Sequence, residues 1–191
     1  MTEKPHWLPS MLDLIGKSEE ECLSILYTIF TRDFKNGRPL FRGLPVWWNR
    51  KILPQQHYEE GFWHLVSREE RDTVNRRLDL PRAQRLPWCK PVLTNSDANP
   101  IKVWNYLERG HRLRTYVWLE PWDYCVVLEH RNLSGKQIAW LITAFHVDGA
   151  SRRRNLQRKF ERREEENLGV RYCIEYQPSW LIDERYCSPL L

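Results

Sequence analysis

Three β-rich stretches that follow one another closely decide the fold: Arg112–Leu119 (RLRTYVWL), Tyr124–His130 (YCVVLEH) and Gln137–Val147 (QIAWLITAFHV). Each is rich in β-branched and aromatic residues, which favour strands. The joints between them, PWD and RNLSGK, have lengths suited to hairpins. The sequence therefore predicts an antiparallel β-meander as the architectural centre of the protein.

Helix signals flank this meander on both sides. Ser18 with Glu21, and Ser67 with Glu70, have the spacing of capping boxes. Asn99 is an N-cap candidate, Pro100 after it is preset for a first helical turn, and Gly110 stands where that helix would stop. The predicted helices are Ser18–Arg32, a short helix from Ser67 that ends before Pro81, Asn99–Arg109, and a basic helix from Ser151 to about Asn167.

Shorter strands complete the predicted fold. The run GFWHLV (Gly61–Val66) reads as a strand, Leu40–His57 as short strands or loops, and Val170–Tyr176 as a final strand. The expected fold class is α+β, with helices followed by an antiparallel meander in a single domain. We divide the chain into an N-terminal helical element (1–39), the α+β domain proper (40–178) and a C-terminal tail (179–191).

The composition is that of one basic, aromatic-rich domain. A chain of 191 residues with 41% hydrophobic residues can bury a sizeable core, and 30 Lys+Arg against 25 Asp+Glu give a net charge of +5. Ten Trp, eight Tyr and six Phe exceed what such a core usually needs, which predicts that some rings lie at the surface as contact residues.

Several functional classes lack their usual signature. The five cysteines form no C-x-x-C or Cys/His cluster, so neither a disulfide framework nor a zinc site is expected. Glycine-rich nucleotide motifs, HExxH and GxSxG are absent, and we expect no cofactor and no metal. Without a signal peptide or a membrane-spanning apolar run, the expected compartment is the reducing cytoplasm, with no membrane contact.

Positive charge is concentrated at positions 151–163, where seven of thirteen residues are basic. Arg154, Arg158 and Arg162 recur every four residues, a spacing at which like charges oppose helix formation unless something compensates. An anionic ligand would compensate, and so would salt bridges to nearby glutamates on a solvated face. Because the basic residues outnumber these acids, we interpret the helix as a surface that binds an anion, RNA above all.

The first strand of the meander offers a second candidate surface. Side chains alternate along a strand, so Arg112, Arg114, Tyr116 and Trp118 share one face. Cations beside rings on which bases can stack are typical of surfaces that bind single-stranded nucleic acid. The alternative is a solvated face on which arginine stems pack against the rings, and both interpretations stay open.

His64 is the candidate proton carrier, because a neutral imidazole near pH 7 can accept and return a proton. A lone histidine in a strand is more often structural. The segment DLPRAQRLPW that follows it favours the functional interpretation. There Arg82 and Arg85 could bind a scissile phosphate, and Trp88 could support a base.

Thr143 interrupts the apolar run AWLITAF, and a hydroxyl there needs a hydrogen-bond partner if it is buried. Its partner could be the backbone. The functional hypothesis makes Thr143 a donor to a phosphate oxygen, with His146 near the same strand end as a second candidate proton carrier. His130 and His111 are weaker candidates, because each ends an element beside solvent-type residues.

The order of these motifs resembles a known family. GFWHLVSRE, then PRAQRLPW, then a meander ending in LITAF and a basic helix are similar to the phage-associated branch of the barnase, EndoU, colicin and RelE-like (BECR) ribonuclease superfamily. The resemblance covers roughly residues 40 to 165. It implies a small α+β fold and a metal-independent endoribonuclease that leaves a 2′,3′-cyclic phosphate. The family's histidine, its arginine or lysine, and its serine or threonine would match His64, Arg85 with Arg82 close by, and Thr143.

The resemblance also implies a biological role and a partner. Such enzymes often act as toxins or as phage or defence effectors, which implies a neutralising protein of the antitoxin or immunity type. Residues 1–39 have no counterpart in the family pattern and would form an interaction element. Two alternatives stay open: a nucleic-acid-binding protein without catalysis, and a phage protein-interaction or inhibitor module whose aromatic excess forms an interface core.

Overall fold

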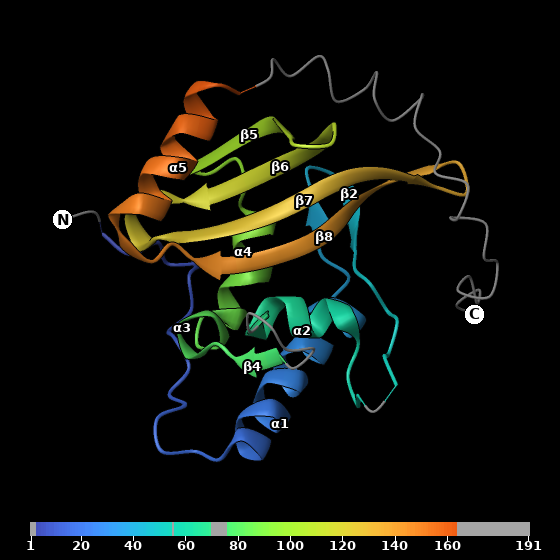
Figure 1. Ribbon diagram of the computed structural model, residues 1–191, viewed down its shortest axis with the longest axis vertical. Coiled ribbons are helices and arrows are strands. Elements are labelled where there is room, and N and C mark those ends of the chain that lie inside the picture. The colour runs from blue at the N-terminus through green and yellow to red at the C-terminus, as the bar shows by residue number, and fades with distance from the viewer. Residues whose placement is uncertain (1–2, 55, 70–75, 164–191) are drawn as a thin grey trace.

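Six strands form the main sheet of the computed structural model, which describes residues 3–54, 56–69 and 76–163 (Figure 1). They are β1 (Leu40–Phe41), β2 (Leu44–Trp47), β5 (Ile101–Glu108), β6 (Arg112–Leu119), β7 (Tyr124–Leu133) and β8 (Lys136–His146), in the spatial order β1-β2-β8-β7-β6-β5. Every neighbouring pair is antiparallel except β2 with β8, which is parallel. The predicted meander is confirmed as β6, β7 and β8.

The turn between β7 and β8 fits its sequence. Ser134 and Gly135 both have positive φ, at 50° and 78°, as the central residues of a type I′ turn do. Leu133 and Lys136 flank the turn as a strand pair. This turn twists with the flanking strands, and the long β7–β8 hairpin extends away from the rest of the domain (Figure 1).

The prediction of a helix over Asn99–Arg109 is wrong, because this segment is β5. Its apolar residues lie on both faces of the sheet: Ile101 packs against one hydrophobic core, and Trp104 belongs to another. A strand that is covered on both faces carries apolar residues at odd and even positions, so a spacing of three arises without a helix. All eight residues of β5 pair with β6.

The predictions for residues 61–80 are also wrong, and the two elements change places. GFWHLV lies in the helix α2 (Glu60–Val66), and the helix expected from Ser67 is absent from the residues described there, where β3 (Ser67–Glu69) pairs with β4 (Arg76–Leu78). A short apolar run fits a buried helix as well as a buried strand. The hydroxyl of Ser67 donates to the carbonyl of Trp63 at 2.7 Å, which closes α2 and does not cap a following helix.

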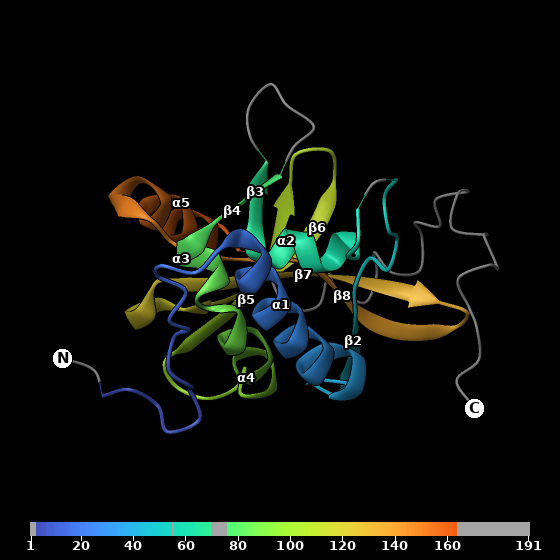
Figure 2. The ribbon, with the colours of Figure 1, turned by 90° about the horizontal axis from the view of Figure 1, so that it is seen from below.

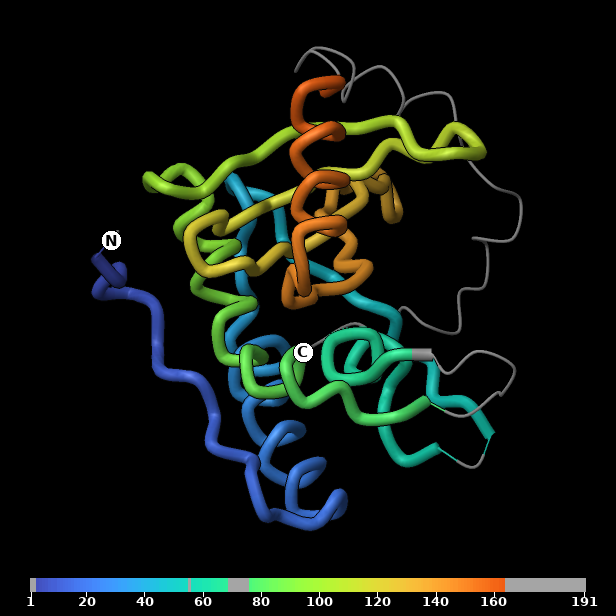
Figure 3. The backbone as a smooth tube through the Cα atoms, turned by 60° about the vertical axis from the view of Figure 1, so that its left-hand side comes forward, coloured from blue at the N-terminus to red at the C-terminus, as the bar shows by residue number. Residues whose placement is uncertain are grey.

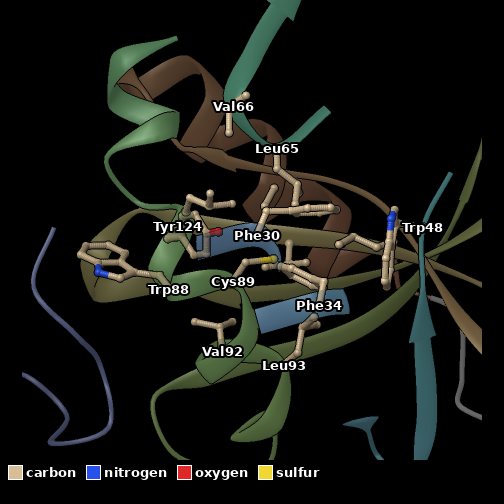
Figure 4. Close-up of a cluster of buried hydrophobic side chains, with 14 of the residues drawn as sticks. Phe30, Phe34, Trp48, Leu65, Val66, Trp88, Cys89, Val92, Leu93 and Tyr124 are labelled. Atoms are coloured by element: carbon tan, nitrogen blue, oxygen red, sulfur yellow. The ribbon is translucent and has the colours of Figure 1, made fainter. Parts of the chain in front are cut away.

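Helices cover both faces of the sheet. On one face lie α1 (Glu19–Phe30), α2, α3 (Leu80–Ala83) and α4 (Cys89–Thr94), gathered on the near side in the view from below (Figure 2). Between these helices and the sheet lies the larger core, in which Phe30, Phe34 and Trp48 contact one another through tilted and edge-on rings (Figure 4). The N-terminal segment therefore contributes to the same core as the rest of the chain.

The helix α5 (Gly149–Glu161) packs on the opposite face and crosses the strands there (Figure 3). Leu156 and Phe160 are its inward residues, and they pack in the smaller core with Trp104 and Trp118.

Two further expectations concern the ends of the chain. The capping box at Ser18 is confirmed, and α1 continues beyond Phe30 as a π-helical turn over Thr31–Asn36. The strand predicted at Val170–Tyr176, the end of the basic helix and the tail 179–191 lie outside the described residues. Within the described ranges, no helix has the length and apolar content needed to span a membrane.

Candidate functional site

The side chains of Thr143 and Arg82 meet at the backbone oxygen of His64, near the carboxyl end of α2. The Thr143 hydroxyl, on β8, donates to the backbone oxygen of His64 at 2.8 Å. Nη1 of Arg82, on α3, donates to the same oxygen at 3.0 Å and lies 3.4 Å from the Thr143 hydroxyl oxygen. We call His64, Arg82 and Thr143 the α2 cluster. It unites three residues that the sequence singles out across a separation of 79 positions.

Thr143 can contact α2 and α3 because it lies on a part of β8 that is at the edge of the sheet. β2 pairs with β8 only through Ala139 and Trp140, so in the described chain the second half of β8 has no strand beside it there, and α2 and α3 contact it instead. Leu141 and Thr143 pair with consecutive residues of β7, which makes Ile142 the extra residue of a bulge. Bulges often re-aim side chains next to functional sites.

The guanidinium of Arg82 makes all its hydrogen bonds to the described residues through Nη1. Besides its contacts in the cluster, Nη1 donates to the backbone oxygen of Ser67 at 2.8 Å, and Nε lies 3.9 Å from a carboxylate oxygen of Asp79. Nε is buried without a hydrogen-bond partner, and Nη2 makes no hydrogen bond within the described parts of the chain. The side chain keeps 16% of its surface exposed. An anion at this surface would therefore find the unused donors of Nη2.

Two further cations and one carboxylate act on the guanidinium of Arg82. Burial lowers its pKa below the usual range, Asp79 opposes this shift, and the charges of Arg68 and Arg152 add to it. Arg68 lies on β3 and Arg152 lies in the first turn of α5, so the cations come from three separate elements. Asp79 pairs with Arg68 at 2.8 Å and offsets part of the repulsion among these cations, and a bound anion would offset more of it.

The ring of His64 contacts a further cation. Nη1 of Arg76, on β4, lies 3.3 Å from Nδ1 of His64. A guanidinium can only donate, so Nδ1 is the acceptor in this contact and a neutral ring carries its proton on Nε2. Sequence reasoning missed Arg68, Arg76 and Arg152 as site residues, because the β3–β4 hairpin read as a helix and Arg152 was one of many arginines in the basic stretch.

Arg85 and Trp88 lie outside the α2 cluster. Arg85 donates to the backbone oxygen of Pro81 at 2.7 Å and stacks over the Trp88 ring at 5.3 Å. Trp88 is 4% exposed, and its indole N–H donates to the backbone oxygen of Pro9 at 2.9 Å. The structure thus places Arg82, and not Arg85, at the centre of the site, and it buries Trp88 where no base can reach its ring.

The strand face of Arg112, Arg114, Tyr116 and Trp118 is not a stacking surface. Tyr116 and Trp118 share a face as expected, but both rings are buried beneath α5 in the smaller core. Arg114 forms an ion pair with Glu129, and Arg112 is exposed. The sequence pattern predicted the alternation correctly and could not show that a helix covers it.

His146 is held at the far end of β8, outside the cluster. Its Nδ1 donates to the backbone oxygen of Asp123 at 3.0 Å, and the carboxylate of Asp123 accepts a hydrogen bond from Arg153 at 2.5 Å. His146 therefore helps to fix the β8–α5 junction.

The cations of α5 divide between two sides. Arg153 and Lys159 form ion pairs with acids of the sheet side, Asp123 and Glu108. Arg154, Arg158 and Arg162 are exposed on the outer side, where the repeat at four-residue spacing predicts an anion-binding surface.

One cavity of the molecule does not coincide with the predicted site residues, and the described residues form no cluster of metal ligands. A cavity of about 410 Å³ opens near Trp7, Arg32 and Lys90, and none of the site residues predicted from the sequence lines it. In the part of the chain that the structure describes, no group of three or more His, Cys, Asp or Glu side chains is placed to hold a metal ion.

The chain matches no protein-family model, no curated protein and no solved structure. The functional assignment therefore depends on the geometry of the α2 cluster and its basic surroundings.

Proposed function

We propose that the protein is a metal-independent endoribonuclease of the BECR-like type and that the α2 cluster is its active site. The observation that carries the proposal is the contact of Thr143 and Arg82 with one backbone oxygen, that of His64. It brings a hydroxyl and a buried guanidinium to the residue that bears an imidazole. These are the groups that phosphoryl transfer through a ribose hydroxyl requires.

In the proposed reaction the ribose 2′-oxygen forms a bond to phosphorus while the bond from phosphorus to the 5′-oxygen breaks. A proton leaves the 2′-hydroxyl and a proton is delivered to the 5′-oxygen, which leaves a 2′,3′-cyclic phosphate. We assign one of these transfers to His64 and the other to a water molecule, which takes up or supplies the second proton. Arg82 stabilises the charge that develops on the phosphate oxygens, and Thr143 orients one of them when its hydroxyl turns from the backbone oxygen of His64 to the phosphate.

This proposal predicts cleavage without a metal. The purified full-length protein is expected to cut single-stranded RNA in the presence of a chelator, because its side chains supply both the proton transfer and the positive charge. The assay separates the products by gel and identifies the new ends by mass spectrometry. Products ending in 2′,3′-cyclic phosphate support the proposal, whereas activity that returns only with added Mg²⁺ contradicts it.

The second candidate is a nucleic-acid-binding protein without catalysis, which the exposed arginines of α5 favour by themselves. In both cases RNA is the proposed partner. A cytoplasmic toxin or defence effector with a neutralising protein partner is the biological setting we propose for the enzyme.

RNA affinity is expected to fall steeply as salt rises, because neutralised phosphates release counterions. Replacing Arg154, Arg158 and Arg162 together by Gln should weaken binding. It should also make the slope of log affinity against log salt less steep, by the amount that the loss of roughly three phosphate contacts predicts. Fluorescence anisotropy at several salt concentrations measures both quantities. The removal of one inward ion pair by Lys159→Gln serves as the control, because it removes a cation without touching the outer surface. An unchanged slope in the triple variant would show that the outer face of α5 is solvated and does not bind RNA.

A further inference from the structure

Two tryptophans stand apart from both hydrophobic cores. Of the nine tryptophans in the described residues, seven belong to one of the cores or pack against it. Trp47 and Trp140 do neither, and both are partly exposed. Large rings at a surface are costly in solubility, and a pair of them is a mark of a contact site.

These two tryptophans lie side by side on adjacent strands. Trp47 of β2 and Trp140 of β8 are register partners in the parallel pair. Their chain neighbours Val46 and Ala139 belong to the larger core, so by alternation the two rings lie on the other face, on which α5 packs. α5 lies across one end of that face, and the β7–β8 hairpin extends beyond it (Figures 1 and 3).

Arginines accompany both rings. The guanidinium of Arg50 lies 4.6 Å from the centre of the Trp47 ring, and that of Arg131 lies 4.3 Å from the centre of the Trp140 ring. Glu129, the register partner of Trp140, forms ion pairs with both Arg131 and Arg114. The row across β2, β8, β7 and β6 therefore carries two rings and three guanidinium groups against one carboxylate.

This row lies close to the α2 cluster. Trp140 precedes Thr143 by three residues on β8, which corresponds to roughly 10 Å along a strand. Thr143 pairs with Val127, whose side chain belongs to the smaller core on the α5 face. A single strand of nucleic acid bound at the cluster would reach the two tryptophans within a few nucleotides.

We propose that Trp47 and Trp140 form a stacking platform for single-stranded RNA, a substrate subsite beside the α2 cluster. The inference rests on the proposed function for its choice of RNA as the ligand. Bases stack on the two rings and on the guanidinium planes of Arg50 and Arg131, and the same arginines neutralise phosphates. The bases of a duplex are stacked on one another and cannot use such a platform, so the structure favours a single strand.

The first experiment measures binding without cleavage. The probe is a fluorescein-labelled oligouridylate whose riboses are 2′-O-methylated, so that no 2′-hydroxyl can attack. Trp47→Ala and Trp140→Ala are each expected to weaken its binding at least about fivefold, and Trp47→Phe and Trp140→Phe to retain most of it, because a ring remains. Arg50→Gln, at an exposed residue, should weaken binding without affecting the fold. Trp122→Ala, beside the larger core, is the matched control.

The second experiment separates this inference from the proposed function. A dinucleotide such as UpA reaches the α2 cluster without the platform, so the Trp47→Ala and Trp140→Ala proteins should cleave it at the wild-type rate and show a raised KM only for long RNA. Oligouridylate binding through the two rings in a protein that cleaves nothing would keep the platform and end the ribonuclease proposal. Cleavage with unchanged oligouridylate affinity in both alanine variants would overturn the platform and leave the rings to another kind of partner.

Discussion

The His64→Ala protein is expected to lose RNA cleavage by about a hundredfold or more and to keep its affinity for uncleavable RNA. The imidazole moves a proton in the transition state and contributes little to the ground state, so kcat should fall while binding stays. The backbone oxygen of His64, and not its ring, holds Thr143 and Arg82, so this substitution removes the proton carrier and leaves the two hydrogen bonds in place. Single-turnover cleavage and anisotropy measure the two effects separately.

Two matched controls sharpen this prediction. His146→Ala removes a histidine of the same strand region whose ring is bonded to the backbone at Asp123, and it should leave cleavage nearly unchanged. Arg82→Gln should reduce cleavage about a hundredfold, whereas Arg85→Gln, three residues along the chain and outside the cluster, should not. Full activity in His64→Ala with a loss in His146→Ala would move the proton chemistry to the end of β8.

The Trp104→Ala protein is expected to lose roughly 3–5 kcal/mol of the free energy of unfolding, as other large aromatic truncations in cores do. Trp104 is 3% exposed, and its ring contacts Tyr116, Trp118 and Phe160 with centroids 5.2, 6.2 and 5.3 Å away. It therefore joins β5, β6 and α5 in the smaller core. Urea unfolding followed by circular dichroism measures the loss.

The control for this stability prediction is Trp140→Ala, since Trp140 lies outside both cores. Its substitution should cost clearly less free energy of unfolding than that of Trp104. Equal losses in the two variants, or a loss below about 1 kcal/mol for Trp104→Ala, would mean that the smaller core does not hold α5 to the sheet.

The meander could be predicted because its signals are local. The β-rich runs and the turn residues that separate them, such as Ser134 and Gly135, can be recognised without knowledge of the rest of the fold. The strand β5 could not be predicted, because both of its faces are covered and its apolar residues Ile101 and Trp104 therefore have a helical spacing. Only the pairing with β6 decides between a strand and a helix. For the GFWHLV run, the buried pattern is the same for a strand and for one turn and a half of helix.

The residues of the candidate site could be singled out from the sequence, but their arrangement in space could not. His64, Arg82 and Thr143 stood out by residue type, but the choice between Arg82 and Arg85 depends on which one reaches β8, a question of tertiary distance. The alternation along β6 gives no sign that α5 covers the rings of Tyr116 and Trp118. The part-exposed pair Trp47 and Trp140 could not be found beforehand, because the parallel pairing of β2 with β8 joins segments about ninety residues apart.

Cleavage of a DNA strand that contains one ribose tests the central claim most directly. In chelator, the protein should cut this strand only at the phosphate that follows the ribose and leave a 2′,3′-cyclic phosphate, and Arg82→Gln should slow that cut about a hundredfold. Methylation of the same 2′-oxygen should abolish it. An intact strand after prolonged incubation, or a cut at a deoxyribose position, would contradict the assignment of the α2 cluster as a ribonuclease site.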